Sequence, residues 1–383
     1  MHDLAIVGAG PVGGTLALAL AHADLDIVAF DARPRGASPR GDRSLALSHG
    51  ARLILERLGV WATLAAREGA VTPIHAIDVS QAGGFGLTRL EADEQRVPAL
   101  GYVVAYAALQ QEIDRALEQV GADVRFDAPV SRVDGDARSA RVQVDSTQGE
   151  ISARLAVVAD GAGTSVAGIE RKRHAYDQVA LVGAVWTDRP HAGVAYERFT
   201  PAGPMALLPE RDHYGLVWTM RPDRARALLA LADDAFLVAL ARAFGSRVTG
   251  FTRVDSLRTF PLVLERAHPI VSARAVVIGN AAQQLHPVAG QGFNLGLRDA
   301  WELASIVLDT PRDALGSPAM LARHAARRAR DRTSGIAFTH GLVRIFGNDS
   351  ALLRWPRGLA LAALDAVPPV KRAFARTMLF GVR

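Results

Sequence analysis

The chain has 383 residues, of which 49% are hydrophobic and 22% are charged, and its formal net charge is +5. This balance is ordinary for a globular protein, and the length allows two or three hydrophobic cores. Because the chain has no cysteine, disulfides, thiolate metal sites and redox-active dithiols are excluded. The chain enters an apolar run within three residues, and no run approaches the ~18 apolar residues that span a bilayer. We therefore expect a cytoplasmic protein.

A glycine-rich turn follows the first predicted strand. After the apolar run Leu4–Val7 the chain reads Gly8-Ala9-Gly10-Pro11-Val12-Gly13, and a helix is predicted directly behind it. Gly8 suits a tight turn, Gly10 lets the backbone approach a pyrophosphate, and Gly13 allows close packing of helix on strand. Free N–H groups at the helix start would bind the anion. A glycine turn without a ligand is the alternative.

The second predicted strand, Ile27–Phe30, ends at Asp31. An acid at this position can accept both hydroxyls of a ribose, and it favours a ribose without a phosphate. FAD and NAD both carry such a ribose.

The pattern of the remaining chain predicts an α/β fold. Helices are predicted near 48–58, 107–120 and 233–243, and from 309 to the end with breaks at Pro356 and at Pro368-Pro369. Alternating runs with hairpin spacing between 179 and 264 predict an antiparallel sheet. We therefore expect a discontinuous Rossmann-like FAD-binding domain with an inserted antiparallel-sheet substrate domain and a C-terminal helical region. The expected parts are 1–73, 101–178 and 269–308 for the FAD-binding domain, 74–100 for strands added to the substrate sheet, 179–268 for the substrate domain, and 309–383 for the C-terminal helices.

A second glycine-rich segment lies about 270 residues after the first. Behind a predicted strand at 275–278 the chain reads Gly279-Asn280-Ala281-Ala282, and then Gly290-Gln291-Gly292-Phe293-Asn294-Leu295-Gly296. Two such segments, each leading into a helix, favour a single large phosphorylated cofactor held at both places, and so favour FAD.

The second segment carries a family resemblance. Residues 279–300 resemble the signature of single-component FAD-dependent aromatic hydroxylases, Asp160–Ser165 resembles their Asp-Gly motif, and Arg43–Ser48 resembles their flavin-facing arginine segment. Tyr176–Ala180 and Glu197–Pro204 resemble the ubiquinone-biosynthesis branch of that family. Within this branch, Asn280-Ala281-Ala282-Gln283 is most similar to the 2-polyprenyl-6-methoxyphenol hydroxylases.

The resemblance implies a role for each matching residue. Asp31 would bind the adenosine ribose, Arg43 the pyrophosphate, and Asn280 the ribityl chain and pyrophosphate. Gln111, on the predicted helix 107–120, would face the cofactor, and Asp160 would contact the cofactor or the electron donor; the alternative is that Asp160 only closes a turn. The remaining implied cofactor-binding residues are Gly8, Gly10, Pro11, Val12, Gly13 and Gly290, with backbone N–H groups of Gly292, Phe293 and Asn294 at the flavin.

Two positions depart from the family pattern. Asn280 replaces an aspartate, and its amide oxygen still accepts a hydrogen bond while a charge that repels phosphate is removed. Gly168 stands where an arginine is usual, which leaves open how the NAD(P)H donor, or part of the pyrophosphate, is bound.

The implied reaction is hydroxylation of a polyprenylated phenol in ubiquinone biosynthesis, using NAD(P)H and O2 through a flavin C4a-hydroperoxide. His286 either adjusts the phenol proton or holds its loop so that the backbone of Pro287 faces the ring, and the structural role is favoured. Alternate residues of the inserted strands would line an aromatic pocket or form ordinary sheet core; they are Tyr196, Phe199, Trp218 and Met220.

The C-terminal region is basic, with 13 Lys/Arg and 4 Asp/Glu between 311 and 383. Arginines there alternate with leucines and phenylalanines, as in a segment that lies on a membrane surface. A tail packed on the body, a protein partner such as a ubiquinone-biosynthesis complex, or a dimer contact would show the same pattern. No motif indicates nucleic-acid binding.

Two other functions fit the sequence. One is an FAD-dependent reductase of a polyprenyl or aromatic substrate, whose product gains no oxygen. The other is a flavin-free lipid-binding scaffold of the same pathway, which would purify without colour.

Overall fold

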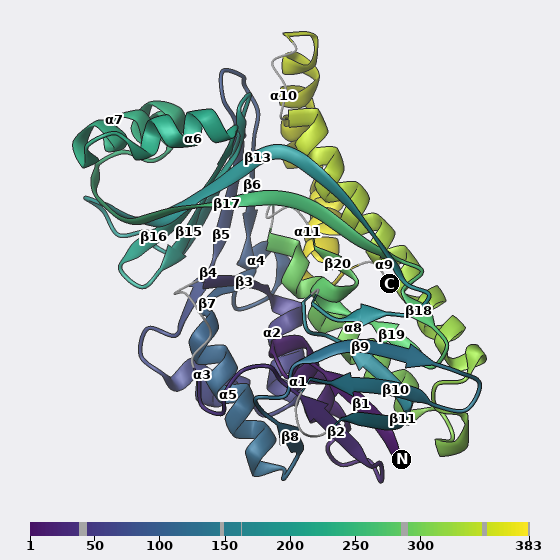
Figure 1. Ribbon diagram of the computed structural model, residues 1–383. Coiled ribbons are helices and arrows are strands. Elements are labelled where there is room, and N and C mark those ends of the chain that lie inside the picture. Colours follow the sequence, from purple (N-terminus) through teal and green to yellow (C-terminus); the bar gives the residue numbers. More distant parts are fainter. Residues whose placement is uncertain (38–43, 146–148, 162, 285–289, 347–350, 382–383) are drawn as a thin grey trace.

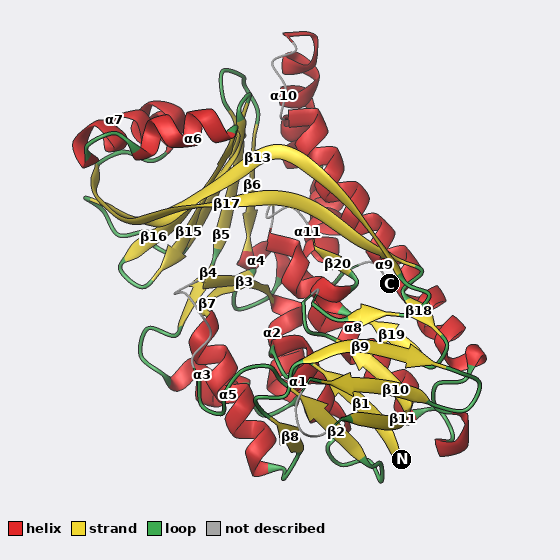
Figure 2. Ribbon diagram, in the orientation of Figure 1, coloured by secondary structure: helices red, strands yellow, loops and turns green. Residues whose placement is uncertain are grey.

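The computed structural model describes residues 1–37, 44–145, 149–161, 163–284, 290–346 and 351–381 (Figure 1). Two large sheets lie one above the other, and long C-terminal helices run alongside both of them (Figure 2). No helix among these residues is long and apolar enough to cross a membrane.

The lower, nine-stranded sheet contains strands from all three predicted parts of the FAD-binding domain. β1 pairs in parallel with β2 and with β11, and β11 pairs in parallel with β19. The carboxyl ends of β1, β11 and β19 therefore lie at one edge of the sheet, and a crevice at such an edge is where open α/β sheets bind ligands. The strands are β1 (His2–Val7), β2 (Ile27–Phe30), β8 (Asp123–Arg125), β9 (Val130–Gly135), β10 (Ala140–Val144), β11 (Glu150–Val158), β12 (Ser165–Val166), β18 (Val271–Ser272) and β19 (Ala275–Val277).

Helices and a small sheet cover one face of this sheet and enclose the largest core. The core joins Leu4 and Ile6 of β1 to Leu16 of α1, Ile113 of α5 and Leu303 of α8. Its apolar positions recur at helical spacing, which explains why these segments fold as helices. The elements are α1 (Pro11–Leu20), α2 (His49–Arg57), α3 (Trp61–Ala66), α5 (Tyr106–Gln119), α8 (Gln291–Leu308), and the three-stranded sheet of β3 (Ser44–Ser48), β7 (Gly101–Ala105) and β4 (Val71–Ile74). The short helix α4 (Ala92–Gln95) packs in a separate small cluster.

The upper, eight-stranded sheet corresponds to the inserted sheet, and α6 (Pro222–Leu229) and α7 (Asp233–Phe244) cover its outer face (Figure 1). β5 and β6, from the segment 74–100, join it through a parallel pairing of β5 with β14. In spatial order the strands are β20 (Gln283–Gln284), β17 (Phe251–His268), β13 (Glu170–Thr187), β16 (His213–Met220), β15 (Gly203–Glu210), β14 (Val194–Thr200), β5 (Ala76–Gln81) and β6 (Leu87–Glu91). A mixed α/β architecture with an inserted sheet is thus confirmed.

The C-terminal region forms three helices, α9 (Pro318–Phe346), α10 (Ala351–Ala366) and α11 (Pro368–Phe380). Pro368 begins α11, as expected for a residue whose ring fixes a helical φ. The predicted break at Pro356 is wrong, because α10 continues through it. Three short 3-10 turns, η1 (Gly245–Arg247), η2 (Gly279–Ala281) and η4 (Arg312–Ala314), complete the described elements.

Candidate active site

The first glycine turn can be formed only by glycines at two of its positions. Gly8 has φ +94°, and a Cβ there would lie 2.7 Å from the Cα of Asp160. A Cβ on Gly13 would lie within 1.8 Å of the carbonyl oxygen of Gly8. A Cβ on Gly10 would meet nothing within 4 Å, and Gly10 begins α1 without a side-chain cap. The turn is thus tight on its protein side and open at Gly10, where the first N–H groups of α1 can bind an anion.

Asp31 is buried at the carboxyl end of β2, beside this turn. Its carboxylate accepts hydrogen bonds from the N–H of Ala9 (2.9 Å) and the N–H of Arg33 (2.8 Å). The Arg33 guanidinium also pairs with Asp31 (3.1 Å) and with Asp114 on α5 (3.2 Å). The acid is thereby held in a fixed orientation within reach of a ribose bound at the turn.

Of two neighbouring glutamines on α5, the structure places Gln110 at the turn. Its Nε2 donates to the carbonyl of Ala9 (3.1 Å) and to Asp114 (2.7 Å), while its Oε1 is buried and has no hydrogen-bond partner among the described residues. Gln111, predicted to face the cofactor, is exposed and accepts a hydrogen bond from Arg67 (2.8 Å). A buried acceptor without a partner costs free energy, and a hydroxyl of a bound ribose would satisfy it.

The two glycine segments meet at one side chain. A Cβ on Gly279 would lie 3.1 Å from the Cγ1 of Val12, and a Cβ on Gly296 would lie 3.0 Å from its Cγ2. Both segments therefore lie side by side at the carboxyl edge of the nine-stranded sheet, despite their separation in the sequence. Asn280 is exposed on η2 beside this contact.

Asn294 holds the start of α8 against β3. Its Oδ1 accepts from the N–H of Ser48 (2.8 Å), and its Nδ2 donates to the carbonyls of Ala46 (3.0 Å) and Gly290 (2.9 Å). Gly290 precedes α8 in a left-handed conformation (φ 58°) and has no side-chain cap. The side chain of Asn294 is thus fully engaged, while Gly292 and Phe293 lie in the uncapped first turn of the helix.

Asp160 closes a turn behind β11. Its Oδ2 accepts from both the N–H and the hydroxyl of Thr164 (2.7 Å each), and its backbone packs on Gly8. These contacts show that Asp160 closes a turn, as the alternative interpretation from the sequence proposed. Arg43, His286 and Pro287 lie outside the described residues.

Three of the four predicted pocket residues lie on the outer face of the eight-stranded sheet. Trp218 and Met220 belong to the core between the sheet and α6–α7, and the Trp218 ring meets Phe236 of α7 edge-on (6.3 Å between centroids). Tyr196 meets Phe244 of α7 in the same way (6.3 Å). For these three residues the pocket prediction is wrong and the alternative, ordinary sheet core, holds.

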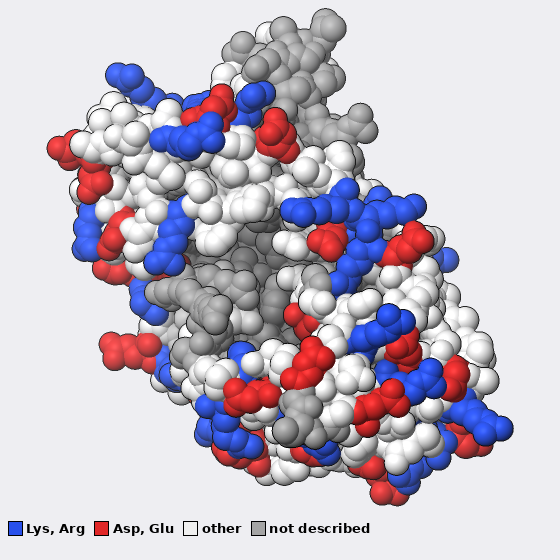
Figure 3. Space-filling view, in the orientation of Figure 1, with Lys and Arg blue, Asp and Glu red and all other residues white. Residues whose placement is uncertain are grey.

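The opposite face of this sheet, here called the inner face, is turned toward the FAD-binding domain. On β14, Ala195 packs in a buried cluster with Ile74 of β4 and Val103 of β7. Phe199, four residues further along the same strand, shares this face and is buried. β15 is tied to β3 by a hydrogen bond from the Ser44 hydroxyl to Glu210. Figure 3 shows that the molecule is hollowed between the two sheets.

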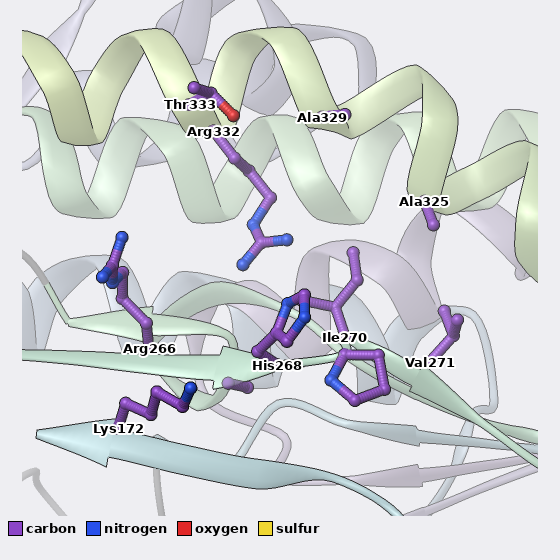
Figure 4. A pocket seen from close by; sticks show the side chains of 11 residues that line it. Lys172, Arg266, His268, Ile270, Val271, Ala325, Ala329, Arg332 and Thr333 are labelled. Carbon is purple, nitrogen blue, oxygen red and sulfur yellow. The ribbon is translucent and has the colours of Figure 1, made fainter.

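A cavity of about 460 Å³ lies elsewhere, between α9 and the ends of β13 and β17. Arg332 points into it from α9, and Lys172 and Arg266 approach from the strands (Figure 4). Burial and the like charges of Arg328 and Arg266 lower the pKa of Arg332. With an apolar floor that includes Ile270, this cavity suits an anion, but neither glycine segment lines it.

Comparisons with known proteins agree with this geometry. A family model described as an FAD-binding domain matches residues 1–333. The ubiquinone hydroxylase UbiL of Rhodospirillum rubrum is 36% identical, over 98% of this chain and 88% of its own. The 3-demethoxyubiquinol 3-hydroxylase of Escherichia coli is 31% identical over 97% and 96%, and the human ubiquinone biosynthesis monooxygenase COQ6 is 27% identical over 97% and 91%.

Solved structures share the fold. The p-nitrophenol 4-monooxygenase PnpA of Pseudomonas putida superposes with a TM-score of 0.78 at 18% identity, covering 100% of this chain and 99% of its own. PqsL of Pseudomonas aeruginosa superposes with a TM-score of 0.76 at 21% identity, covering 96% and 100%. The expected fold, the FAD cofactor and the resemblance seen in the sequence are confirmed. The chain belongs to the FAD-binding-domain family and, within it, is a relative of the ubiquinone-biosynthesis hydroxylases.

Proposed function

We propose that this protein is an FAD-dependent monooxygenase that hydroxylates the aromatic ring of a polyprenylated phenol in ubiquinone biosynthesis, with NAD(P)H and O2 as co-substrates. Relatives that match nearly the whole chain carry names of ubiquinone hydroxylases and monooxygenases. The observation that carries the proposal is the contact of both glycine segments with Val12, because it brings two helix N-termini to one crevice.

The residues at the crevice suit the successive parts of FAD. Asp31 and the unpartnered Oε1 of Gln110 would accept hydroxyls of the adenosine ribose, and the start of α1 at Gly10 would bind the pyrophosphate. Asn280, exposed on η2, would meet the ribityl chain. The uncapped start of α8 would present N–H groups to the flavin edge, where its positive dipole end favours negative charge. FAD, once bound, supplies the redox and oxygen chemistry.

The inner face of the eight-stranded sheet would hold the substrate ring. This part of the protein has to orient the ring and exclude water, since it contributes positioning rather than redox chemistry. Phe199 lies on that face, and Ala195 anchors it to the FAD-binding domain.

A membrane surface is the proposed source of the polyprenylated substrate. Trp355 (67% exposed) and Leu359 (58%) lie on α10, and the Trp355 ring contacts exposed Phe85 at a tilt (5.1 Å between centroids, 55° between ring planes). Exposed Val367 and Val370 follow at the start of α11. Apolar side chains of this kind, on basic helices, suit a contact with the cytoplasmic surface of the membrane or with a ubiquinone-biosynthesis complex.

The direct test uses the purified protein loaded with FAD, a phenol with a short prenyl tail, NAD(P)H and isotopically labelled O2. We expect one labelled oxygen atom in the product by mass spectrometry. A product without added oxygen would indicate a reductase. A protein that stays colourless after incubation with FAD would contradict the cofactor assignment, and unchanged quinone pools after gene deletion would contradict the pathway.

A further inference from the structure

An isolated carboxyl group, that of Glu197, lies on the inner face of the eight-stranded sheet. Glu197 is two residues from Ala195 and two from Phe199 on β14, so it shares their face. Its cross-strand partners are Val79 on β5 and Ala206 on β15. Because paired residues point to the same face, the carboxyl group lies among short apolar side chains.

This carboxyl group has no compensating partner. Glu197 makes no hydrogen bond or ion pair with any residue that the structure describes, whereas Asp78 of the same sheet pairs with Arg89 (3.3 Å) and Glu210 accepts from Ser44. Burial raises the pKa of Glu197 to about 8. Glu197 is part-buried, and removing an unpaired acid from water even in part costs stability, so a chemical use of the group accounts for it better than folding does.

The charged groups around Glu197 leave it isolated. Among the described residues of β5, β14, β15 and β16, the other titratable side chains on the inner face are Glu210 and His213. Each lies four residues along its strand from the residue level with Glu197, and Glu210 accepts from Ser44. Arg258 shares the face on β17, four strands away. Of the helices near this face, α10 carries the buried Arg357, and α11 carries Lys371, which binds Glu94 and Asp365. Neither cation pairs with Glu197. The side chains of α9 beyond residue 337 are not among those described.

We propose that Glu197 accepts the proton of the substrate's phenolic hydroxyl, an assignment that rests on the function proposed above. The carboxylate takes the proton, the O–H bond breaks, and its electron pair stays on the ring oxygen. The products are a phenolate and a neutral carboxylic acid, which later releases the proton to water. The phenolate ring is richer in electrons than the phenol ring, and this accelerates the transfer of an electrophilic oxygen to the ring.

The surroundings of Glu197 suit the transfer energetically. A free glutamate has a pKa of about 4.3 and a phenol such as tyrosine about 10, so an ordinary glutamate is a poor acceptor. A pKa near 8 reduces the difference between the pKa values of the carboxyl group and the phenol, while a fraction of Glu197 remains ionised at neutral pH. The predicted hydroxylation rate therefore rises with pH up to about pH 8.

The first test needs no turnover. Because the pKa of Glu197 is higher in the folded than in the unfolded chain, the folded state binds more protons between about pH 4.3 and pH 8. This contribution to stability is complete below that window and is lost as the pH rises through it. The melting temperature of Glu197→Gln should therefore equal that of the wild type in acid and exceed it above pH 8. The control is Glu170→Gln, at an exposed position on β13.

The second test addresses the proton. A bound phenolic substrate analogue should show the absorption of a phenolate with the wild type and Glu170→Gln, but of a neutral phenol with Glu197→Gln. With substrate and NAD(P)H, Glu197→Gln should lower kcat for hydroxylation by about 10²-fold or more and remove the rise with pH.

The outcomes separate the two proposals. An ionised phenol on Glu197→Gln, or an unchanged kcat and pH profile, would overturn the role of Glu197 while leaving the hydroxylase intact. A wild type that hydroxylates no phenol would overturn both proposals. Coincident melting curves at every pH would show that Glu197 does not titrate near pH 8, and would also overturn its role.

Discussion

Gly10 and Gly13 lie three residues apart in one turn but have opposite surroundings. A Cβ at Gly13 would overlap the Gly8 carbonyl, whereas a Cβ at Gly10 would enter open space. We expect Gly13→Ala to lower the melting temperature and abolish FAD retention. Gly10→Ala should melt like the wild type without cofactor, yet bind FAD more weakly, because its methyl group enters the space proposed for the pyrophosphate. Melting curves and FAD titrations measure both effects.

Equal FAD affinity of Gly10→Ala and wild type would show that the pyrophosphate does not pass this residue. Normal melting of Gly13→Ala would show that the turn relaxes more easily than its contacts imply.

Site residues can be predicted from the sequence where a tight backbone turn requires a particular residue type. They are predicted poorly where the role depends on the direction in which a side chain points. The glycines of both segments were identified because tight turns require them. The family resemblance implies Gln111, whereas the structure places Gln110 at the turn. Neighbouring helical residues differ by about 100° in direction, so a shift of one position in the match changes which side chain meets the turn. For Trp218 and Met220 the sequence leaves pocket and sheet core both open, because strand alternation separates two faces without saying which one faces the cofactor. The same alternation groups Glu197 with Ala195 and Phe199.

A buried ion network connects two helices to the second glycine segment. Arg328 on α9 donates to Asp299 on α8 (2.7 Å) and to Asp331 (2.8 Å), and the other oxygen of Asp299 accepts from the N–H of Gly279 (3.1 Å). Arg328→Met would leave the buried carboxylate of Asp299 without its cation, whereas Asp331 keeps Arg298 (2.8 Å), and the change should cost about 3–5 kcal/mol of unfolding free energy. Arg327→Met, at the neighbouring exposed residue, should cost less than about 1 kcal/mol.

Chemical denaturation of both variants measures the difference. Similar small losses for the two would mean that the network is not needed for stability, and that Gly279 is positioned by Val12 alone.

Elements with a regular apolar period were predicted nearly to the residue. The helix expected at 107–120 is α5 (Tyr106–Gln119), and that expected at 233–243 is α7 (Asp233–Phe244). The long strands β13 and β17 were predicted only in part, because their outer ends pair mainly with each other and carry charged, exposed residues without apolar alternation. Register shifts within this pair also break the period.

For the whole molecule, the proposed contact with a membrane depends on the exposed apolar side chains of α10. Replacing Trp355 and Leu359 together by serine should reduce co-sedimentation with vesicles of anionic and zwitterionic phospholipid, because the exposed apolar area falls. Leu308→Ser, at a residue of similar exposure (56%) on α8, should leave vesicle binding unchanged. Equal binding of all three proteins would point to a protein partner or to no contact at this surface.

The shared contact at Val12 also sets an order of events during synthesis. The amino-terminal glycine turn leaves the ribosome early. Gly279 and Gly296, which both lie against Val12, are synthesised last among the parts of the crevice. A nascent chain that ends before residue 279 contains only the first of the two glycine segments that form the crevice, so FAD binds late in synthesis. Prematurely terminated chains should accordingly accumulate without yellow colour, however much riboflavin the cell provides.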